Sequence, residues 1–409
     1  MAVSFMDQIT REKQEFIERC KSCGKCLEKC RIRPFSNYAA GVPAELRKAQ
    51  IDFLKGGEFS QMLYDMAFSC IGCHYCSDAC EHGLDPSRMG AISRIELVTR
   101  GQDAPPTYSF ALPGEHFNYF SILSALLLNP SQTRWMTRTP ESPQHADVVY
   151  FPGCGLHVSP DRLFTSLDIL DRMGLNYVAL GGIAHCCGVP YMAAGKGTEC
   201  GERRDRLVES ISAFTPKTAV MICPGCTMRL AGNFAAPSEL PFRPMHFAAF
   251  LGENLDRLRF EKSIDKTVAI HDPCKLGRGL GEFEGVRKVL GAIPGLRVVE
   301  MRHWGKNTLC CSGSASMSYP KAAKELGLVI MEEAKETGAD LLVDLCLGCH
   351  RALRGLSKDY PFEVVSFVTL VGRAMGIEYE DKLSLYLKWR NVDRVISDAR
   401  ANIAASSYS

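Results

Sequence analysis

The chain of 409 residues carries little net charge and has no long apolar run. Its 48 basic and 46 acidic residues give a formal charge of +2, so no electrostatic footprint for nucleic acid is expected. The longest apolar stretch, residues 117–128, is too short to span a bilayer. The first residues lack the basic and apolar parts of a secretory signal. These absences predict a cytoplasmic protein that binds no nucleic acid.

A dinucleotide-binding fingerprint is also missing. The sequence contains 35 glycines but no G-x-G-x-x-G segment, so any flavin or nicotinamide cofactor is expected on a partner protein. With 46% hydrophobic and 23% charged residues, the composition is that of an ordinary globular chain with room for two or three domains.

Cysteine, in contrast, is abundant, with nineteen residues. In a cytoplasmic protein, cysteines at C-x2-C spacings favour metal binding over disulfides. All but Cys200, which is expected to be a small buried residue, fall into four groups. The groups are Cys20, Cys23, Cys26 and Cys30; Cys70, Cys73, Cys76 and Cys80; Cys154, Cys186, Cys187, Cys223 and Cys226; and Cys274, Cys310, Cys311, Cys346 and Cys349.

The first two groups share the spacing C-x2-C-x2-C-x3-C. In two-cluster bacterial ferredoxins the fourth cysteine ligates the other cluster, although the proline that usually follows it is absent here. Residues 44–64 between the groups read as helix, Gly-Gly break, helix. We therefore expect an α-helical ferredoxin module that relays electrons through two cubane [4Fe–4S] clusters. Their ligand sets would be Cys20, Cys23, Cys26 and Cys80, and Cys70, Cys73, Cys76 and Cys30.

The second two groups belong to an internal repeat. An offset of 120 residues lays Cys154 on Cys274 and residues 241–252 on 361–372. The other paired cysteines stay in step with small insertions, so a duplicated unit of about 120 residues is the economical explanation.

Each copy of the repeat alternates strands and helices. Such alternation predicts parallel α/β sheets, whose ligands sit beyond the carboxyl ends of the strands, where the cysteines lie. The expected fold class is therefore α/β, with an N-terminal α-helical ferredoxin module followed by a duplicated α/β pair with parallel sheets. The expected strands are 147–151, 176–180, 218–222, 267–270, 296–301 and 341–345. The expected domains are 1–105 (ferredoxin module), 106–146 (linker), 147–260 and 261–376 (the two copies) and 377–409 (helical tail).

Five cysteines in each copy exceed the four thiolates that a cubane cluster needs. Adjacent Cys186 and Cys187 point in different directions, so they cannot comfortably chelate one iron. They could bridge different irons, or one could remain a free, activated thiolate. Each copy thus predicts either a cubane with a spare nucleophile or an unusual cluster that uses all five cysteines.

Cys186-Cys187-Gly188, within C-x31-C-C-G-x34-C-x2-C, resembles the CCG motif of the heterodisulfide reductase family. The second copy departs slightly, because Ser312-Gly313 follows Cys310-Cys311. Residues 271–278 (HDPCKLGR) resemble that family's second-half signature. With the ferredoxin groups, residues 15–375 resemble the fused C/B arrangement, in which a small iron–sulfur subunit precedes the catalytic one within a single D-type chain, as in the membrane-linked enzyme.

This resemblance implies two non-cubane [4Fe–4S] clusters, each held by five cysteines, that cleave a disulfide between them. It also implies a hetero-oligomeric complex with a flavoprotein or iron–sulfur redox subunit, such as the family's A-type protein or a dehydrogenase. Related subunits of glycolate and lactate dehydrogenases leave two alternatives open: a non-catalytic electron wire, and a quinone-linked subunit peripheral to the cytoplasmic membrane face whose residues 117–128 contact a membrane partner.

Several residues beside the cysteines are further candidates. His185 and His271 can donate a proton or hydrogen bond to cluster sulfur or to a leaving thiolate, or they are satisfied polar loop residues. His350 fits the second alternative better, and His74 either tunes its cluster or faces solvent. Lys275, Arg229 and Arg278 offset thiolate charge or meet an anionic substrate, with solvated surface as the alternative. Close backbone approach to the clusters is expected at Gly188, Gly225, Gly313 and Gly348.

Overall fold

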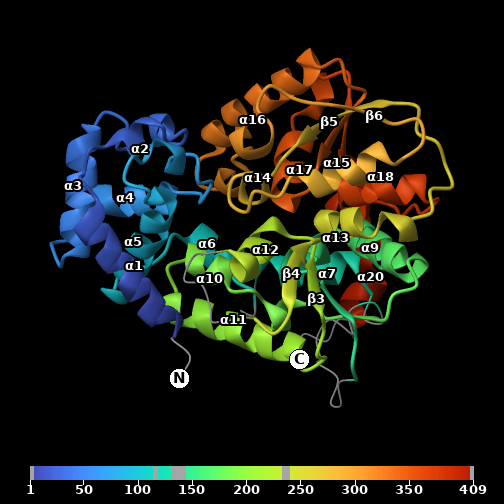
Figure 1. The fold of residues 1–409 in the computed structure, drawn as a ribbon, viewed down its shortest axis with the longest axis horizontal. Helices are drawn as coiled ribbons and strands as arrows, with labels where there is room; N and C mark the ends of the chain where they lie inside the picture. The colour runs from blue at the N-terminus through green and yellow to red at the C-terminus, as the bar shows by residue number, and fades with distance from the viewer. Residues whose placement is uncertain (1–3, 114–117, 130–131, 133–143, 233–239, 406–409) are drawn as a thin grey trace.

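The chain folds into a helical N-terminal module and two α/β halves, drawn in Figure 1 in blue, green to yellow, and orange to red. This computed structural model describes residues 4–113, 118–129, 132, 144–232 and 240–405. The expected fold class is confirmed. Within these ranges, no helix combines the length and the apolar character that a membrane crossing requires.

The N-terminal module is built around helix α5, which is buried on most of its faces. The expected helix, Gly-Gly break and helix are present as α3 and α4. Two helices end directly at cluster cysteines, because Cys20 is the C-cap of α1 and Cys70 that of α4. The helices are α1 (Phe5–Arg19), α2 (Lys25–Glu28), α3 (Pro43–Leu54), α4 (Gln61–Ser69) and α5 (Pro86–Thr99), with 3₁₀ helices at Arg33–Phe35 and Ser77–Ala79.

Each half contains a parallel four-stranded sheet, with order β2-β1-β3-β4 in the first and β6-β5-β7-β8 in the second. The central strands are apolar and covered on both faces, as buried parallel strands are. The sequence prediction missed β4 and β8, which open the repeated segments 241–252 and 361–372. The strands are β1 (Val148–Phe151), β2 (Tyr177–Ala179), β3 (Thr218–Met221), β4 (Arg243–His246), β5 (Thr267–His271), β6 (Arg297–Val299), β7 (Leu341–Asp344) and β8 (Glu363–Ser366).

The helices of the two halves cover the sheets in equivalent positions. Those that follow the cysteine loops are short, and α11 and α16 are the long helices of each half (Figure 1). The first half contains α9 (Pro160–Arg172), α10 (Val189–Ala193), α11 (Gly197–Ser212), α12 (Pro224–Ala231) and α13 (Phe247–Glu253). The second half contains α14 (Cys274–Gly277), α15 (Glu284–Gly291), α16 (Pro320–Glu336), α17 (Leu347–Arg354) and α18 (Phe367–Ala374). Further 3₁₀ helices lie at Cys154–Val158, Ile183–His185, Leu255–Arg257, Gly305–Asn307, Gly313–Ala315 and Ser357–Asp359.

The two halves share one hydrophobic core, formed where α13 packs on α15 and, reciprocally, α18 packs on α9. Both crossings are close. A Cβ added to Gly252 would lie 3.1 Å from the Gly285 Cα, and one added to Gly372 would lie 2.4 Å from the Thr165 methyl. These pairs are equivalent under the 120-residue offset. The duplicated units are therefore fixed in a pseudo-symmetric pair, which sets the relative position of their cysteine edges.

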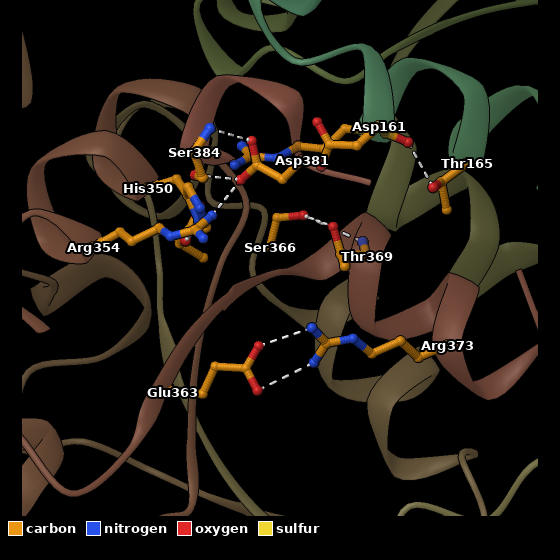
Figure 2. Close-up of polar contacts among 12 residues, drawn as sticks. Asp161, Thr165, His350, Arg354, Glu363, Ser366, Thr369, Arg373, Asp381 and Ser384 are labelled. Carbon is orange, nitrogen blue, oxygen red and sulfur yellow. Dashed lines mark hydrogen bonds and ion pairs between the residues drawn. The ribbon is translucent and has the colours of Figure 1, made fainter. Parts of the chain in front are cut away.

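The linker and the tail pack on each other. Helices α6 (Pro106–Phe110) and α7 (Tyr119–Leu127) lie in the linker, where residues including Phe117 fall outside the described ranges. The tail contains α19 (Lys382–Trp389) and α20 (Val392–Ala405), and α20 lies along α7 (Figure 1). In Figure 2, Asp381 at the start of α19 accepts from the Ser384 amide at 2.9 Å and pairs with Arg354 of α17. The tail thus joins the linker to the second half.

Helices α13 and α18 begin at the same repeat position with different capping residues. His246 Nδ1 accepts from the Ala248 amide at 3.2 Å, and its Nε2–H donates to the Ile222 carbonyl at 3.0 Å. Ser366 Oγ instead accepts from the Thr369 amide at 3.2 Å. Burial lowers the pKa of His246 to about 4, so the imidazole is neutral at pH 7.

We predict a pH-dependent stability term from His246. Its folded-state pKa lies below the unfolded value of about 6.5, so its contribution is complete above that pH and falls as the pH drops toward 4, by about 1.4 kcal/mol per pH unit. His246→Asn keeps a capping acceptor without the titration. Between about pH 7.5 and 5.5, the melting temperature should therefore fall more steeply for the parent protein than for the variant. Parallel curves would contradict this assignment.

Candidate functional site

Four cysteines from both ends of the N-terminal module enclose a cavity of about 20 Å³. Cys26 lies in α2, and Cys80 follows the 3₁₀ helix Ser77–Ala79, far along the chain. Arg47 of α3 donates from Nη2 to Cys26 Sγ at 3.0 Å, and the solvent-exposed member is Cys23. The cavity joins the cysteines expected from the crossed ferredoxin pattern, Cys20, Cys23, Cys26 and Cys80.

The second crossed group gathers around Cys30. Burial raises the pKa of the Cys30 thiol to about 11, and nearby Cys70 and Cys73 add to this effect. Cys76 feels the charges of the same three cysteines. A Cβ added to Gly90 of α5 would lie 2.8 Å from Cys70 Sγ, so α5 packs directly against this group. Both crossed sets are therefore assembled by the fold.

His74 takes a structural position beside the second group. Its φ of +60° is left-handed, and its Nδ1 lies 2.6 Å from Asp85 Oδ2 and 2.9 Å from Ser87 Oγ. Although burial opposes it, the hydrogen bond and charge of His74 lower the pKa of Asp85. Asp85 in turn caps α5 by accepting from the Ser87 amide at 3.1 Å. His74 is thus buried and paired rather than solvent-facing.

In the first half, sulfur atoms from three loops converge beyond the strand ends. Cys226 Sγ lies 3.3 Å from Cys187 Sγ, and Cys186 lies against Cys154. A hydrogen bond from Cys226 lowers the pKa of Cys223, the residue that begins α12. The adjacent cysteines therefore face different partners.

The second half repeats this arrangement. Cys311 Sγ lies 3.1 Å from Cys349 Sγ, and Cys274 Sγ lies 3.7 Å from Cys310 Sγ. Cys346 begins α17 and lies against Cys349. All nineteen cysteines of the chain are free thiols. Soft thiolate groups at these spacings suit iron–sulfur clusters.

Ser312 occupies the position in the second half that Gly188 occupies in the first. The Gly188 amide donates to Cys186 Sγ at 3.4 Å, and the Ser312 amide donates to Cys310 Sγ at 3.3 Å. Both residues are left-handed, with φ of 86° and 58°. A Cβ at Gly188 would lie 2.4 Å from the Cys200 carbonyl oxygen, so the first half requires glycine while the second has room for serine.

The other candidate glycines admit backbone or sulfur to close contact. A Cβ at Gly313 would lie 2.4 Å from the Gly348 carbonyl oxygen. At Gly225 and Gly348 it would lie 3.6 Å and 3.8 Å from Cys223 Sγ and Cys346 Sγ, which is ordinary contact. The first position is a steric requirement, and the other two face the thiolates.

Asp272 of the 271–278 signature ties two cysteine loops together. Arg287 donates to both of its carboxylate oxygens, at 3.0 Å and 2.9 Å. The Gly305 amide donates to Oδ2 at 2.6 Å. This buried ion pair connects the Cys274 loop to the segment that leads into Cys310.

Lys275 of the same signature is the cation between the two halves. Burial opposes its charged form, but the thiolates of Cys274, Cys223 and Cys346 outweigh burial and raise its pKa. Its side chain lines a cavity of about 190 Å³ that also reaches Cys70. Lys275 therefore lies near cysteines from both halves, and its cavity extends to the N-terminal module.

Arg278 joins the second half to the N-terminal module. Its Nη1 donates to the Cys73 carbonyl at 3.1 Å, its Nε lies 3.4 Å from Asp78, and its guanidinium lies 4.9 Å from the Tyr75 ring centre. The Cys73 thiol itself lies against the thiol of Cys310. Contact between the second ferredoxin-type group and the second five-cysteine group is thus direct.

A cavity of about 620 Å³ separates the two five-cysteine groups. Cys154 and Cys223 line it from the first half, and Cys346 lines it from the second. Arg162 and Arg351 supply positive charge at its wall. Linker aromatics close another side: Phe110, Tyr119 and Phe120. Sulfur atoms from both halves therefore border one largely apolar space.

The histidines lie in different settings. His185 is buried, which lowers its pKa. His350 Nδ1 lies 2.7 Å from Asp344 Oδ2, whereas His271 has Cys311 and Cys349 for neighbours. Solvated surface, the alternative for the cationic candidates, is wrong for Arg229 and Arg278, whose side chains are buried.

Two site residues were not predicted from the sequence. Arg47 contacts Cys26 only through the packing of α3, so no local spacing signals it. His157 is buried beside the first group, and burial lowers its pKa to about 4. Its position three residues after Cys154 is the signal that could have identified it.

Comparisons with known proteins match this geometry. A cysteine-rich domain, CCG, matches residues 148–231 and again 268–354, and a 4Fe-4S dicluster domain matches residues 15–84. The chain is 28% identical over 414 residues to the D subunit of dihydromethanophenazine:CoB–CoM heterodisulfide reductase from Methanosarcina acetivorans, covering 89% of this chain and 95% of that one. The protein of the same name from Methanosarcina mazei is 28% identical over 410 residues, covering 88% and 95%. EtfAB:quinone oxidoreductase of Syntrophomonas wolfei is 22% identical over 364 residues, covering 74% and 48%.

Exchanging glycine and serine after the paired cysteines gives a matched test. Gly188→Ser should lose iron from the first half and lower the melting temperature, because its side chain meets the Cys200 carbonyl in a left-handed backbone. Ser312→Gly should keep its iron and change stability by at most about 1 kcal/mol. Iron per chain and thermal melting under anaerobic conditions measure both. Equal iron loss in the two variants would refute the steric distinction.

Proposed function

Because the chain belongs to the heterodisulfide reductase family, as a D-type protein with a dicluster domain and two CCG domains, we propose that it carries electrons to a disulfide held between its two halves. Its general role is that of an iron–sulfur electron-transfer subunit of oxidoreductase type. The observation that carries the finer proposal is the cavity bordered by Cys154, Cys223 and Cys346.

The proposed cofactors are two cubane [4Fe–4S] clusters in the N-terminal module and two further [4Fe–4S] clusters, of non-cubane type, in the halves. Bound iron–sulfur clusters would supply one-electron transfer at each site. Free thiols, converging sulfur atoms and backbone amides directed at Cys186 and Cys310 support this assignment. The proposed ligands are Cys20, Cys23, Cys26 and Cys80; Cys70, Cys73, Cys76 and Cys30; Cys154, Cys186, Cys187, Cys223 and Cys226; and Cys274, Cys310, Cys311, Cys346 and Cys349.

The contacts between cysteine groups define a route through the chain. Exposed Cys23 is the proposed entry point for electrons from a flavoprotein or another iron–sulfur subunit of a hetero-oligomeric complex. Arg47 lies near both Cys26 and Cys76, between the two ferredoxin-type groups. Contact between Cys73 and Cys310 then leads into the second half.

The cavity is the proposed substrate site. A disulfide takes up two electrons and two protons to give two thiols, so each of its sulfur atoms needs a reducing partner. Cysteines from opposite halves border this space, and Arg162 and Arg351 would attract acidic groups on the substrate. Lys275, close to the thiolates of both halves, offsets negative charge as electrons arrive. His185 and His271 are the proposed hydrogen-bond donors beside the cysteines.

Iron analysis with spectroscopy tests this proposal. Protein purified anaerobically should contain about sixteen irons per chain, with matching acid-labile sulfide, if four clusters are present. Adding thiol or heterodisulfide to the oxidised protein should produce a new paramagnetic signal, because substrate sulfur would then bind in the cavity. Its loss on blocking the cavity with Gly155→Trp, with iron retained, would place that signal there.

Two other results would change the assignment. Full iron content without a thiol-dependent signal would contradict disulfide reduction and favour a non-catalytic wire in a larger flavin- or quinone-linked complex. About eight irons per chain would contradict the cluster assignment in both halves.

Arg278 should support electron transfer into the second half. Arg278→Met removes the bond to the Cys73 carbonyl and the ion pair with Asp78, each a contact of a buried charge worth about 2 kcal/mol. We expect slower reduction of the CCG sites after the ferredoxin-type sites are reduced, measured by freeze-quench EPR, with iron content unchanged. Lys25→Met, which removes an exposed ion pair with Glu81, is the control and should leave this rate unaltered. Equal rates in both variants would refute the route.

A further inference from the structure

The two CCG halves differ in polarity at the last paired position of their central strands. In the first sheet, Phe151 of β1 pairs with Met221 of β3. In the second sheet, the corresponding pair is His271 of β5 and Asp344 of β7. The difference lies three residues before Cys154 and Cys274, where each chain turns into its cysteine loop. The duplicated sites are thus chemically unequal.

His271 is directed at the second cysteine group. It is 2% exposed, and a ring nitrogen lies with Cys311 Sγ and Cys349 Sγ in a cluster of ligand atoms all within 4.8 Å of one another. Its Nε2 is buried and has no hydrogen-bond partner among the described residues. An unpaired buried N–H is costly, so a group between these side chains that accepts from it would offset that cost.

Asp344, the strand neighbour of His271, is committed elsewhere. Its Oδ2 lies 2.7 Å from His350 Nδ1, and the two side chains are almost completely buried. A carboxylate-paired histidine is the ordinary way to satisfy such a ring. His350 therefore provides the bland explanation for a buried histidine in this half, and His271 does not share it.

Resting on the proposed function, we infer that His271 contacts the iron–sulfur cluster of the second half through Nε2 and makes that half the first of the two to be reduced. Hydrogen bonds to cluster sulfur favour the reduced state, because they stabilise the added negative charge and raise the reduction potential. Phe151 provides no such group in the first half. Sequence divergence after duplication has thus given one site a polar contact and the other an apolar one.

The position of the electron relay fits this inequality. Cys73 of the N-terminal module lies against Cys310, in the half that contains His271. Arg278 of that half also holds the Cys73 loop. Proximity and the His271 contact therefore favour the same half as the first acceptor, and the half with Phe151 receives its electron afterwards.

Nitrogen coupling tests the contact. Full-length holoprotein labelled with ¹⁵N-histidine should show nitrogen hyperfine coupling on the EPR signal of the second site, identified as the signal lost in Cys311→Ser. The coupling should vanish in His271→Phe and persist in His350→Gln, a matched buried histidine of the same half. Absence of coupling in the parent, or its loss only in His350→Gln, would overturn the inference.

The order of reduction is tested by redox titration of the same proteins. His271→Phe should move the midpoint potential of the second site to more negative values, leave the first unchanged, and reduce or reverse the separation between them. His271→Gln, which keeps an N–H donor if phenylalanine prevents cluster binding, should shift it less. Unchanged potentials at full iron content would overturn the inference while leaving the proposed function standing. Iron missing from both halves of the parent protein would instead contradict the proposed function.

Discussion

Buried cations among thiolates are the interaction on which the arrangement of this chain depends. Thiolates gathered at one place repel one another, and burial increases that cost. Arg47 lies beside the first ferredoxin-type group, and Lys275 lies near thiolates of both halves. Arg278 adds a tether, because it holds the Cys73 loop against the second half. The same side chains that offset charge therefore also fix the distances between the cysteine groups.

Duplication explains the remaining architecture. Two copies with the same strand order pack through reciprocal helix crossings, so their cysteine edges border one cavity. Symmetry alone would make the halves equivalent, but the N-terminal module contacts the second half through Cys73 and Cys310. Phe151 and His271 differ at the matching strand position. A symmetric scaffold thus carries two sites with different surroundings.

Local spacing made the cysteine groups predictable from the sequence, since ligands on one loop must follow one another closely. The parallel sheets followed from strand–helix alternation, but β4 and β8 were missed because they are short edge strands, one of which contains Pro244. Contacts across the fold left no such pattern. The bond from Arg47 to Cys26 and the neighbours of Lys275 depend on helix packing and on the meeting of two halves.

The central claim is that four cysteine groups form one chain of sites that enters the second half first. Anomalous scattering at the iron edge, from crystals of the full chain grown anaerobically, tests it most directly. The account predicts four iron peaks, with the peak among Cys30, Cys70, Cys73 and Cys76 closer to the second CCG peak than to the first. Fewer peaks, or a relay peak closer to the first half, would contradict it.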